Sequence, residues 1–100
     1  MELLWKDSNI SYSLSFSPEL NEWITHVDAK TITPSLLKKY RKVVELTNLK
    51  LKERGITRVF GICESKKERK FNLIFGYKEV PGGIVLTDDG LLNYLTVMET

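Results

Sequence analysis

The sequence predicts one α/β (α+β) domain, with a mixed sheet of about five to six strands, a long helix over about 34–54 and a shorter helix over about 65–75. Three observations carry this prediction. Apolar residues alternate with serines between Asn9 and Ser17, which is the period of a half-buried strand. Apolar residues then recur at helical spacing in two segments, and each segment ends at a glycine. A short, β-branched apolar segment separates the two helices.

Two strands are expected before the long helix. The first spans 9–17, and the second spans Glu22 to Asp28, a segment rich in β-forming residues. In the first strand the serines occupy the side predicted to face solvent. The side predicted to be buried carries Ile10, Tyr12, Leu14 and Phe16.

The long helix has clear start and stop signals. Thr33 is a suitable N-cap, and Pro34 occupies the first helical position, where its missing N–H costs nothing. Gly55 fits the C′ position, and Arg54 in the last turn suits the helix dipole. The predicted apolar stripe consists of Leu36, Tyr40, Val43, Val44, Thr47 and Leu51.

The remaining elements alternate between strand and helix. We expect a strand buried on both faces from Ile56 to Cys63, and a helix capped by Ser65 that runs to Phe75. Gly76 ends this helix. Lys67, Phe71, Ile74 and Phe75 are predicted to share one face of it.

A hairpin is expected at the C-terminal end. Its first strand covers 77–80 and 84–87, interrupted by a bend or bulge at Pro81-Gly82-Gly83. Asp88-Asp89-Gly90 makes the turn, and the hairpin pattern favours a strand rather than a helix over 91–98.

Composition narrows the class of protein. The chain has 42% hydrophobic and 28% charged residues, as globular domains do, and 15 basic against 13 acidic residues give a net charge of only +2. Such a charge implies a polyanionic partner only where the charges cluster.

Cys63, the lone cysteine, indicates a reducing compartment, and we expect an inert core residue rather than a nucleophile there. Without a basic leader or a long apolar run, a cytoplasmic protein with no membrane segment is expected.

Two stretches resemble the GNAT superfamily of N-acetyltransferases. In Gly55 to Ser65 a helix-ending glycine leads into a strand and then a polar N-cap, and in Phe71 to Val80 a helix ends in the triplet Phe75-Gly76-Tyr77. With the strand from Glu22, the resemblance covers roughly residues 20 to 98. It is nearest to short GNAT-like proteins encoded by bacteriophages, which would place the chain in the host cytoplasm or in a virion.

The resemblance implies acetyl-CoA as cofactor and no metal. The family holds the cofactor's pyrophosphate at the start of the long helix, where this chain has Lys30, Thr31, Thr33 and Ser35, with Ser65 at the start of the shorter helix. The glycines of the family's loop are absent, and Pro34 removes one donor. An ordinary N-cap explains the same residues. The lone histidine has no second ligand at metal spacing, so no zinc site is expected.

The resemblance also points to catalytic positions. The family often has a tyrosine that acts as general acid for the departing thiolate, and at that position this chain has Asn72, which cannot donate a proton in that role. Tyr77 or Tyr40 could come near the thiolate after a shift of register. The tentative base is Glu22 or His26, which share one strand face with Asp28. The polar side of an edge strand would produce the same pattern.

Two hypotheses follow. The first is a reduced acetyl-CoA-dependent N-acetyltransferase, and the second is a catalytically inactive GNAT-like domain that binds a protein, as a phage factor or virion component. The short N-terminal part leaves no room for the family's additional elements at the acceptor site, so a homodimer partner could complete it. Basic stretches at 38–42 and 66–70 could form a shared positive surface, but glutamates dilute it, so nucleic acid is the less favoured partner.

Overall fold

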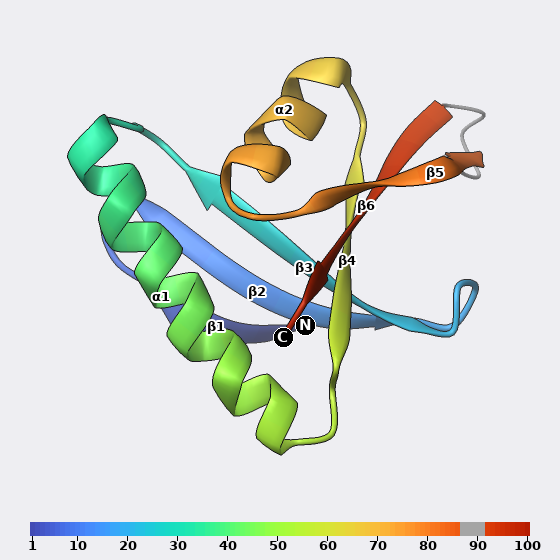
Figure 1. Cartoon of the computed structure of the whole chain (residues 1–100), viewed down its shortest axis with the longest axis horizontal. Coiled ribbons are helices and arrows are strands. Elements are labelled where there is room, and N and C mark those ends of the chain that lie inside the picture. Colours follow the sequence, from blue (N-terminus) through green and yellow to red (C-terminus); the bar gives the residue numbers. More distant parts are fainter. Residues whose placement is uncertain (87–91) are drawn as a thin grey trace.

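The computed structural model describes residues 1–86 and 92–100, and it forms one six-stranded sheet with two helices (Figure 1). The strands lie in the order β1-β2-β3-β4-β6-β5. The elements are β1 (Glu2–Lys6), β2 (Ile10–Ser17), β3 (Glu22–Ala29), α1 (Pro34–Glu53), β4 (Arg58–Cys63), α2 (Lys66–Ile74), β5 (Lys78–Leu86) and β6 (Leu92–Glu99).

The sheet consists of two antiparallel halves that meet at one parallel contact. Strands β1, β2 and β3 pair antiparallel, and so do β4, β6 and β5. Between the halves, β3 and β4 run parallel and share a single register pair, Ile24 with Phe60. The sheet is therefore mixed, and its two central strands share no further register pair beyond that contact.

Helix α1 forms as its sequence predicts. The Thr33 side chain accepts a hydrogen bond from the N–H of Leu36 at 3.2 Å, and Gly55 has the positive φ of +85° that a left-handed C′ residue needs. Tyr40, Val44 and Leu51 of the predicted stripe are buried. Asn48 joins them, which the apolar pattern did not predict.

Helix α2 is short and covers a small area. The Ser65 side chain accepts from the N–H of Glu68 at 3.2 Å, and the Glu68 carboxylate accepts from the N–H of Glu64 at 2.5 Å. These two bonds satisfy one N–H inside the first turn and one just before it. Phe75 is buried, but Ile74 is 46% exposed. The prediction that Ile74 and Phe75 share one face was wrong, because successive residues lie about 100° apart around a helix.

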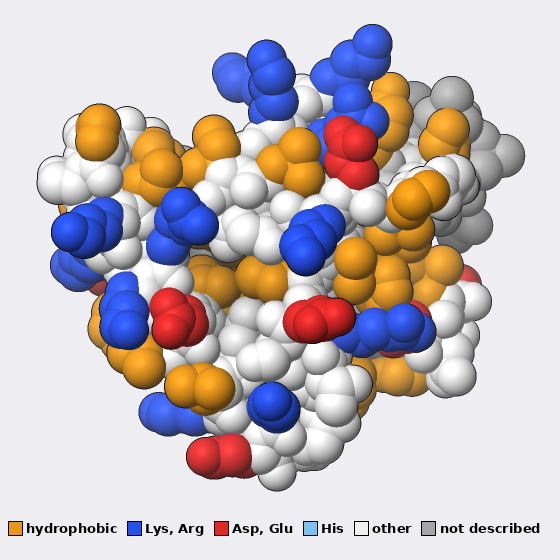
Figure 2. Space-filling model, in the orientation of Figure 1, with side chains coloured by type: hydrophobic (Ala, Val, Ile, Leu, Met, Phe, Trp, Pro, Cys, Tyr) orange, Lys and Arg blue, Asp and Glu red, His pale blue; other side chains and the backbone are white. Residues whose placement is uncertain are grey.

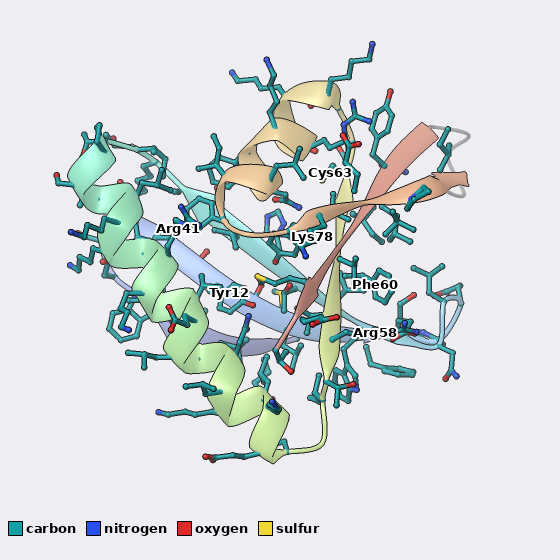
Figure 3. All side chains as sticks on the ribbon, in the orientation of Figure 1. Tyr12, Arg41, Arg58, Phe60, Cys63 and Lys78 are labelled. Atoms are coloured by element: carbon teal, nitrogen blue, oxygen red, sulfur yellow. The ribbon has the colours of Figure 1, made fainter. Side chains whose placement is uncertain are left out.

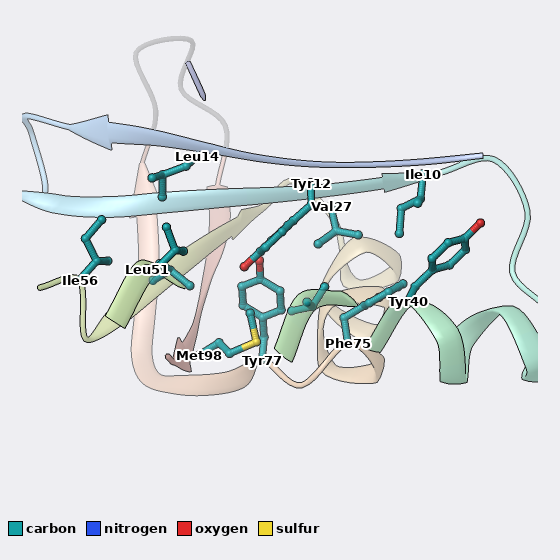
Figure 4. Close-up of a cluster of buried hydrophobic side chains, with 12 residues drawn as sticks. Ile10, Tyr12, Leu14, Val27, Tyr40, Leu51, Ile56, Phe75, Tyr77 and Met98 are labelled. Carbon is teal, nitrogen blue, oxygen red and sulfur yellow. The ribbon is translucent and has the colours of Figure 1, made fainter. Parts of the chain in front are cut away.

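Both helices cover the same face of the sheet, which we call the helix face (Figure 1). One cluster of buried side chains lies beneath them, with contributions from Tyr12 on β2, Val27 on β3, Val44 on α1, Val59 on β4 and Tyr77 before β5 (Figure 4). A helix that buries one apolar stripe against one sheet face accounts for most of the stability of such a domain.

Two hydrogen-bonded pairs of polar side chains lie inside this core. The Tyr12 hydroxyl donates to the Asn48 carbonyl oxygen at 2.8 Å, and the hydroxyls of Thr25 and Tyr77 are 2.5 Å apart. Burial raises the pKa of Tyr12 to about 12 and raises the pKa of Tyr77 well above its usual value. Among the described residues, no buried side-chain nitrogen or oxygen lacks a partner.

Most other expectations about the strands are confirmed, but the expected burial of two β2 side chains is not. Ser13, on the side of β2 predicted to face solvent, is only 8% exposed. The pairing of β5 with β6 shifts register between Glu79 and Ile84, as the predicted bulge requires, while the predicted turn at 88–90 lies outside the described residues. Phe16, predicted to be buried, is 46% exposed at the end of β2 and packs edge-on against Trp23. Strand β1 had not been predicted.

The opposite face of the sheet, the open face, has neither helix on it. By strand alternation it carries Ile24, Phe60 and Ile62, and Phe60 is only 9% exposed because the Arg58 guanidinium lies over its ring at 5.2 Å. Arg58 also pairs with Glu22 across the junction of the two halves. No helix in the described part of the chain is long and apolar enough to cross a membrane.

Candidate functional site

A cleft opens between β3 and β4 beyond their single contact. Its volume is about 470 Å³, and the residues around it come from both sheet faces and from the start of α2. We call it the β3/β4 cleft. It is lined by His26, Val27, Asp28, Ala29, Ile62, Cys63, Ser65, Lys67, Glu68, Phe71 and Asn72.

The cleft follows from the strand pairing. Because β3 is hydrogen-bonded to β2 on one side, half of its backbone groups point toward β4. Past Ile24 and Phe60 the described strands form no further pair, so these groups face the cleft. Backbone N–H and C=O groups need partners, and an extended ligand with amide groups could supply them.

The structure brings two of the three predicted polar residues of β3 into the cleft. His26 and Asp28 both line it and are exposed. Glu22 does not line it, since four residues of strand separate it from His26 by roughly 13 Å. Instead its carboxylate pairs with Arg58, on the other side of the Ile24–Phe60 contact from the cleft. Figure 3 shows Arg58 and Phe60 near one end of β4 and Cys63 near the other.

Asn72 lines the cleft but its amide makes contacts within the protein. The Asn72 Nδ2 atom donates to the Cys63 sulfur at 3.1 Å and to the Thr96 hydroxyl at 3.3 Å, and Thr96 in turn donates to the Gly61 carbonyl at 3.0 Å. These bonds hold α2 against β4 and β6. A Cβ at Gly61 would lie 2.5 Å from the same Asn72 nitrogen, so this close approach requires glycine.

Cys63 ends β4 beneath this contact and is only 1% exposed. Burial is the main reason that the pKa of its thiol is raised, and the nearby carboxylate of Glu68 acts in the same direction. A protonated, buried thiol is a poor nucleophile. The expectation of a buried cysteine is confirmed.

The segment before α1 is held by Asn9. The Asn9 side chain accepts from the Thr31 N–H at 2.9 Å and donates to the Thr31 carbonyl at 2.8 Å, while its own carbonyl accepts from the Lys30 N–H at 2.9 Å. We call this arrangement the Asn9 clamp. It uses the N–H groups of Lys30 and Thr31, which an anion at this position would otherwise need.

The first turn of α1 is similarly occupied. Pro34 has no N–H, the Leu36 N–H bonds to the Thr33 hydroxyl, and the Leu37 N–H bonds to the Thr33 carbonyl at 2.8 Å. The Thr33 and Ser35 hydroxyls lie 3.3 Å apart. The predicted phosphate-binding residues are exposed, but only Ser65 among them lines the cleft.

We expect Asn9→Ala to lower the free energy of unfolding by about 1 to 2 kcal/mol, because it removes three side-chain hydrogen bonds, one of them to the Tyr40 hydroxyl. Urea unfolding followed by circular dichroism measures this change. Ser8→Ala, in the same turn, is the matched control and should be neutral. Equal effects of the two substitutions would contradict the clamp.

Neither tyrosine considered as a substitute acid reaches the cleft. Tyr77 is buried against Thr25, and the Tyr40 hydroxyl bonds to Asn9 and Asp7. Several other cleft residues, among them Lys67 and Phe71, were not predicted as part of the site. Their position within two turns of the Ser65 cap is the signal that could have identified them.

Comparison with protein-family models, curated proteins and solved structures finds no match for this chain. Within residues 1–86 and 92–100, no group of three His, Cys, Asp or Glu side chains is placed to hold a metal ion.

Proposed function

We propose that this chain is a reduced GNAT-like domain whose β3/β4 cleft binds the acyl-pantetheine arm of an acyl-CoA such as acetyl-CoA. The observation that carries the proposal is the single-contact parallel pair at the centre of an otherwise antiparallel sheet, which opens into a cleft of about 470 Å³. The strand order and the helix between β3 and β4 agree with the resemblance of residues 20–98.

The chemistry of the cleft suits this ligand. The pantetheine arm carries two amides, which can pair with the backbone groups that β3 and β4 direct into the cleft. Phe71 and Val27 offer apolar contacts to its methylene groups. His26 and Asp28 lie at the cleft as candidate bases for an incoming amine.

Binding of the nucleotide end of the cofactor should contribute little. The Asn9 clamp and the Thr33 cap already use four of the amide groups around the start of α1, those of Lys30, Thr31, Leu36 and Leu37. We therefore propose that affinity comes from the arm rather than from the phosphates.

A second candidate function is a catalytically inactive GNAT-like domain that acts by binding a protein. The observation that favours it is the structural role of Asn72, whose amide holds α2 on Cys63 and Thr96 at the position where the resembled family has its acid. A domain of this kind would keep the cleft without using it for transfer.

A thermal-shift titration tests whether the cleft binds the acyl-pantetheine arm, and an acetyl-transfer assay then separates the two candidates. We expect acetyl-CoA and acetyl-pantetheine to raise the melting temperature alike, and 3′,5′-ADP to leave it unchanged. A ligand at ten times its Kd adds about 1.4 kcal/mol, which corresponds to several degrees for a domain of this size.

Asp28→Trp should abolish the shift by narrowing the cleft, whereas Glu19→Trp, at an exposed position outside the cleft, should not. If none of the three ligands shifts the melting temperature, the acyl-CoA proposal fails and the inactive domain is preferred. If acetyl-CoA binds but transfers no acetyl group to a panel of amines and peptides, the cleft is a binding site only.

A further inference from the structure

Helix α1 has an outward side that no other element of the described chain covers. Figure 1 shows the helix along one side of the molecule, with the sheet behind it. Its buried side is that of Tyr40, Val44 and Leu51. We call the opposite side the outer face. In the last three turns of the helix, at 3.6 residues per turn, the outer face carries six exposed residues, Lys42, Glu45, Leu46, Leu49, Lys50 and Glu53.

Two leucines lie at the centre of the outer face. Leu46 is 51% exposed and Leu49 is 49% exposed, and because they are three positions apart they are neighbours on the helix surface. Single exposed apolar side chains are ordinary in proteins, but an adjacent pair between charged residues has the form of the apolar centre of a helix–helix contact. Figure 2 shows hydrophobic side chains among basic and acidic ones over α1.

The charges around the leucines are symmetric in position and opposite in sign. Lys42 and Glu53 lie four positions outside the leucine pair, one at each end, and Glu45 and Lys50 lie directly beside it. At both distances a cation on one side is matched by a carboxylate on the other. The outer face therefore shows the same pattern with reversed charges when the helix is read in the opposite direction.

A second α1, laid antiparallel across the first with a twofold axis midway between the leucines, brings these positions together. The leucine pairs of the two helices meet at the centre, where their side chains can interdigitate. Lys42 of each copy faces Glu53 of the other, and Glu45 faces Lys50, so every contact occurs twice. Parallel helices would instead place like charges opposite each other.

These four charges are available for such contacts. Within residues 1–86 and 92–100, the ion pair among them joins Lys42 Nζ to Glu45 Oε1 at 3.7 Å, and the two side chains are 65% and 66% exposed. Exposed pairs of this kind contribute little to stability, so these side chains can reorient at small cost. Lys50 and Glu53 form no ion pair in the same part of the chain.

The alternation of charge also argues against other occupants. A nucleic acid or an anionic membrane would be attracted by Lys42 and Lys50, but it would be repelled by as many carboxylates, those of Glu45 and Glu53. An acidic peptide would meet the same two carboxylates. A partner with the reverse order of charges satisfies all four, and α1 itself, running in the opposite direction, has that order.

We propose that this chain forms a twofold-symmetric dimer in which the outer faces of two α1 helices cross antiparallel. Lys38 and Lys39 then lie beside the C-terminal end of the partner helix, where the helix dipole favours cations. The contact extends over residues 42–53, roughly 18 Å of helix. Because one helix pair buries less than the roughly 1,200 Å² of a stable complex, we expect a weak dimer with a Kd on the order of 100 µM.

The proposal goes beyond the acyl-CoA function, because the outer face and the β3/β4 cleft share no residue. Sedimentation equilibrium of the full chain, at concentrations from about 10 µM to about 1 mM, measures the association. We expect the average mass to rise from that of one chain toward that of two. The association should weaken as salt is added, because exposed ion pairs are screened.

A charge swap provides the sharpest comparison. Glu53→Lys should weaken the dimer at least fivefold, because the twofold symmetry places lysines opposite each other at two points. Adding Lys42→Glu to the same chain reverses both positions, and it should restore the Kd to within twofold of the natural value. Glu19→Lys makes the same change of charge at an exposed position away from α1, and it should alter the Kd less than twofold.

The leucines are tested separately. Leu46→Ser with Leu49→Ser should weaken the dimer at least tenfold, because four leucines leave the centre of the contact. The apolar control is Leu73→Ser with Ile74→Ser on α2, where the side chains are 37% and 46% exposed, and it should leave the Kd unchanged. All of these positions are exposed, and unchanged melting temperatures establish that each variant folds.

Four outcomes would overturn the proposal: a chain that stays monomeric at the highest concentration, unchanged association of the leucine variant, no restoration by the charge swap, or equal weakening by Glu19→Lys. A monomeric chain that sediments with vesicles of anionic phospholipid would also overturn it, and would assign the outer face to a membrane surface. The acetyl-CoA thermal shift should be the same in every variant. Failure of the dimer and failure of the acyl-CoA proposal are therefore distinguishable.

Discussion

We expect the domain to unfold as the pH rises from 10 to 12. Tyr12 and Tyr77 are buried and neutral in the core, and burial raises the pKa of Tyr12 to about 12 and that of Tyr77 in the same direction. An unfolded chain releases these protons near pH 10. The stability that the neutral tyrosines contribute is therefore complete below pH 10 and is lost as the pH rises through the folded pKa values.

The expected effect is large for a domain of 100 residues. The raised pKa of Tyr12 alone corresponds to about 2 to 3 kcal/mol, and Tyr77 adds to it. Urea midpoints measured by circular dichroism at several pH values, with tyrosinate absorbance recorded in parallel, follow both events. Ionisation of these tyrosines near pH 10 with native circular dichroism retained would contradict their burial.

The double variant Tyr12→Phe, Tyr77→Phe is the control, because lysines also lose their charge in this pH range. At pH 7 it should be less stable than the natural chain by about 1 to 3 kcal/mol, since Asn48 and Thr25 lose hydrogen-bond partners. Its stability should nevertheless change less between pH 10 and 12. A parallel pH dependence in both proteins would assign the alkaline transition to other groups.

Gly61→Ala should destabilise the domain by about 1 to 3 kcal/mol. The added methyl group would lie 2.5 Å from the Asn72 amide nitrogen and 2.9 Å from the Thr96 hydroxyl, so α2 or its side chains must move. The direction of this stability change is informative, because replacing glycine by alanine in a strand otherwise stabilises the chain by restricting its unfolded state.

A double-mutant cycle with Asn72→Ala tests this contact. Shortening Asn72 removes the nearest atom, so the double variant should lose less than the sum of the single losses. Urea unfolding of the four proteins provides the coupling energy. A neutral Gly61→Ala, or additive losses, would show that α2 does not rest on β4 at this point.

The sequence predicted the helices well because their signals are local. Thr33, Pro34 and Gly55 determine where α1 begins and ends by hydrogen bonding and backbone conformation that depend on a few neighbours. The same holds for the Ser65 cap of α2. Ile74 was misplaced because periodicity over nine residues does not specify which side of a short helix meets the sheet.

The candidate site was harder to predict because it depends on contacts between distant segments. Asn9 bonds to Thr31 twenty-two residues away, and no local pattern around either residue indicates that bond. Glu22, His26 and Asp28 share a strand face as predicted, yet only strand pairing determines that His26 and Asp28 reach the cleft while Glu22 meets Arg58. Alternation gives the face of a residue but not its neighbours on the next strand.

The single Ile24–Phe60 contact has a mechanical consequence. On the helix face next to this contact, the hydroxyls of Thr25 and Tyr77 form a hydrogen bond. This bond connects β3 to the segment before β5, and so joins the two halves of the sheet on the core side. After Ile24 in β3 and Phe60 in β4, the described strands form no further pair that would hold their C-terminal ends together. We therefore expect the ends of β3 and β4 that line the cleft to move more independently of each other than any two strands within one antiparallel half.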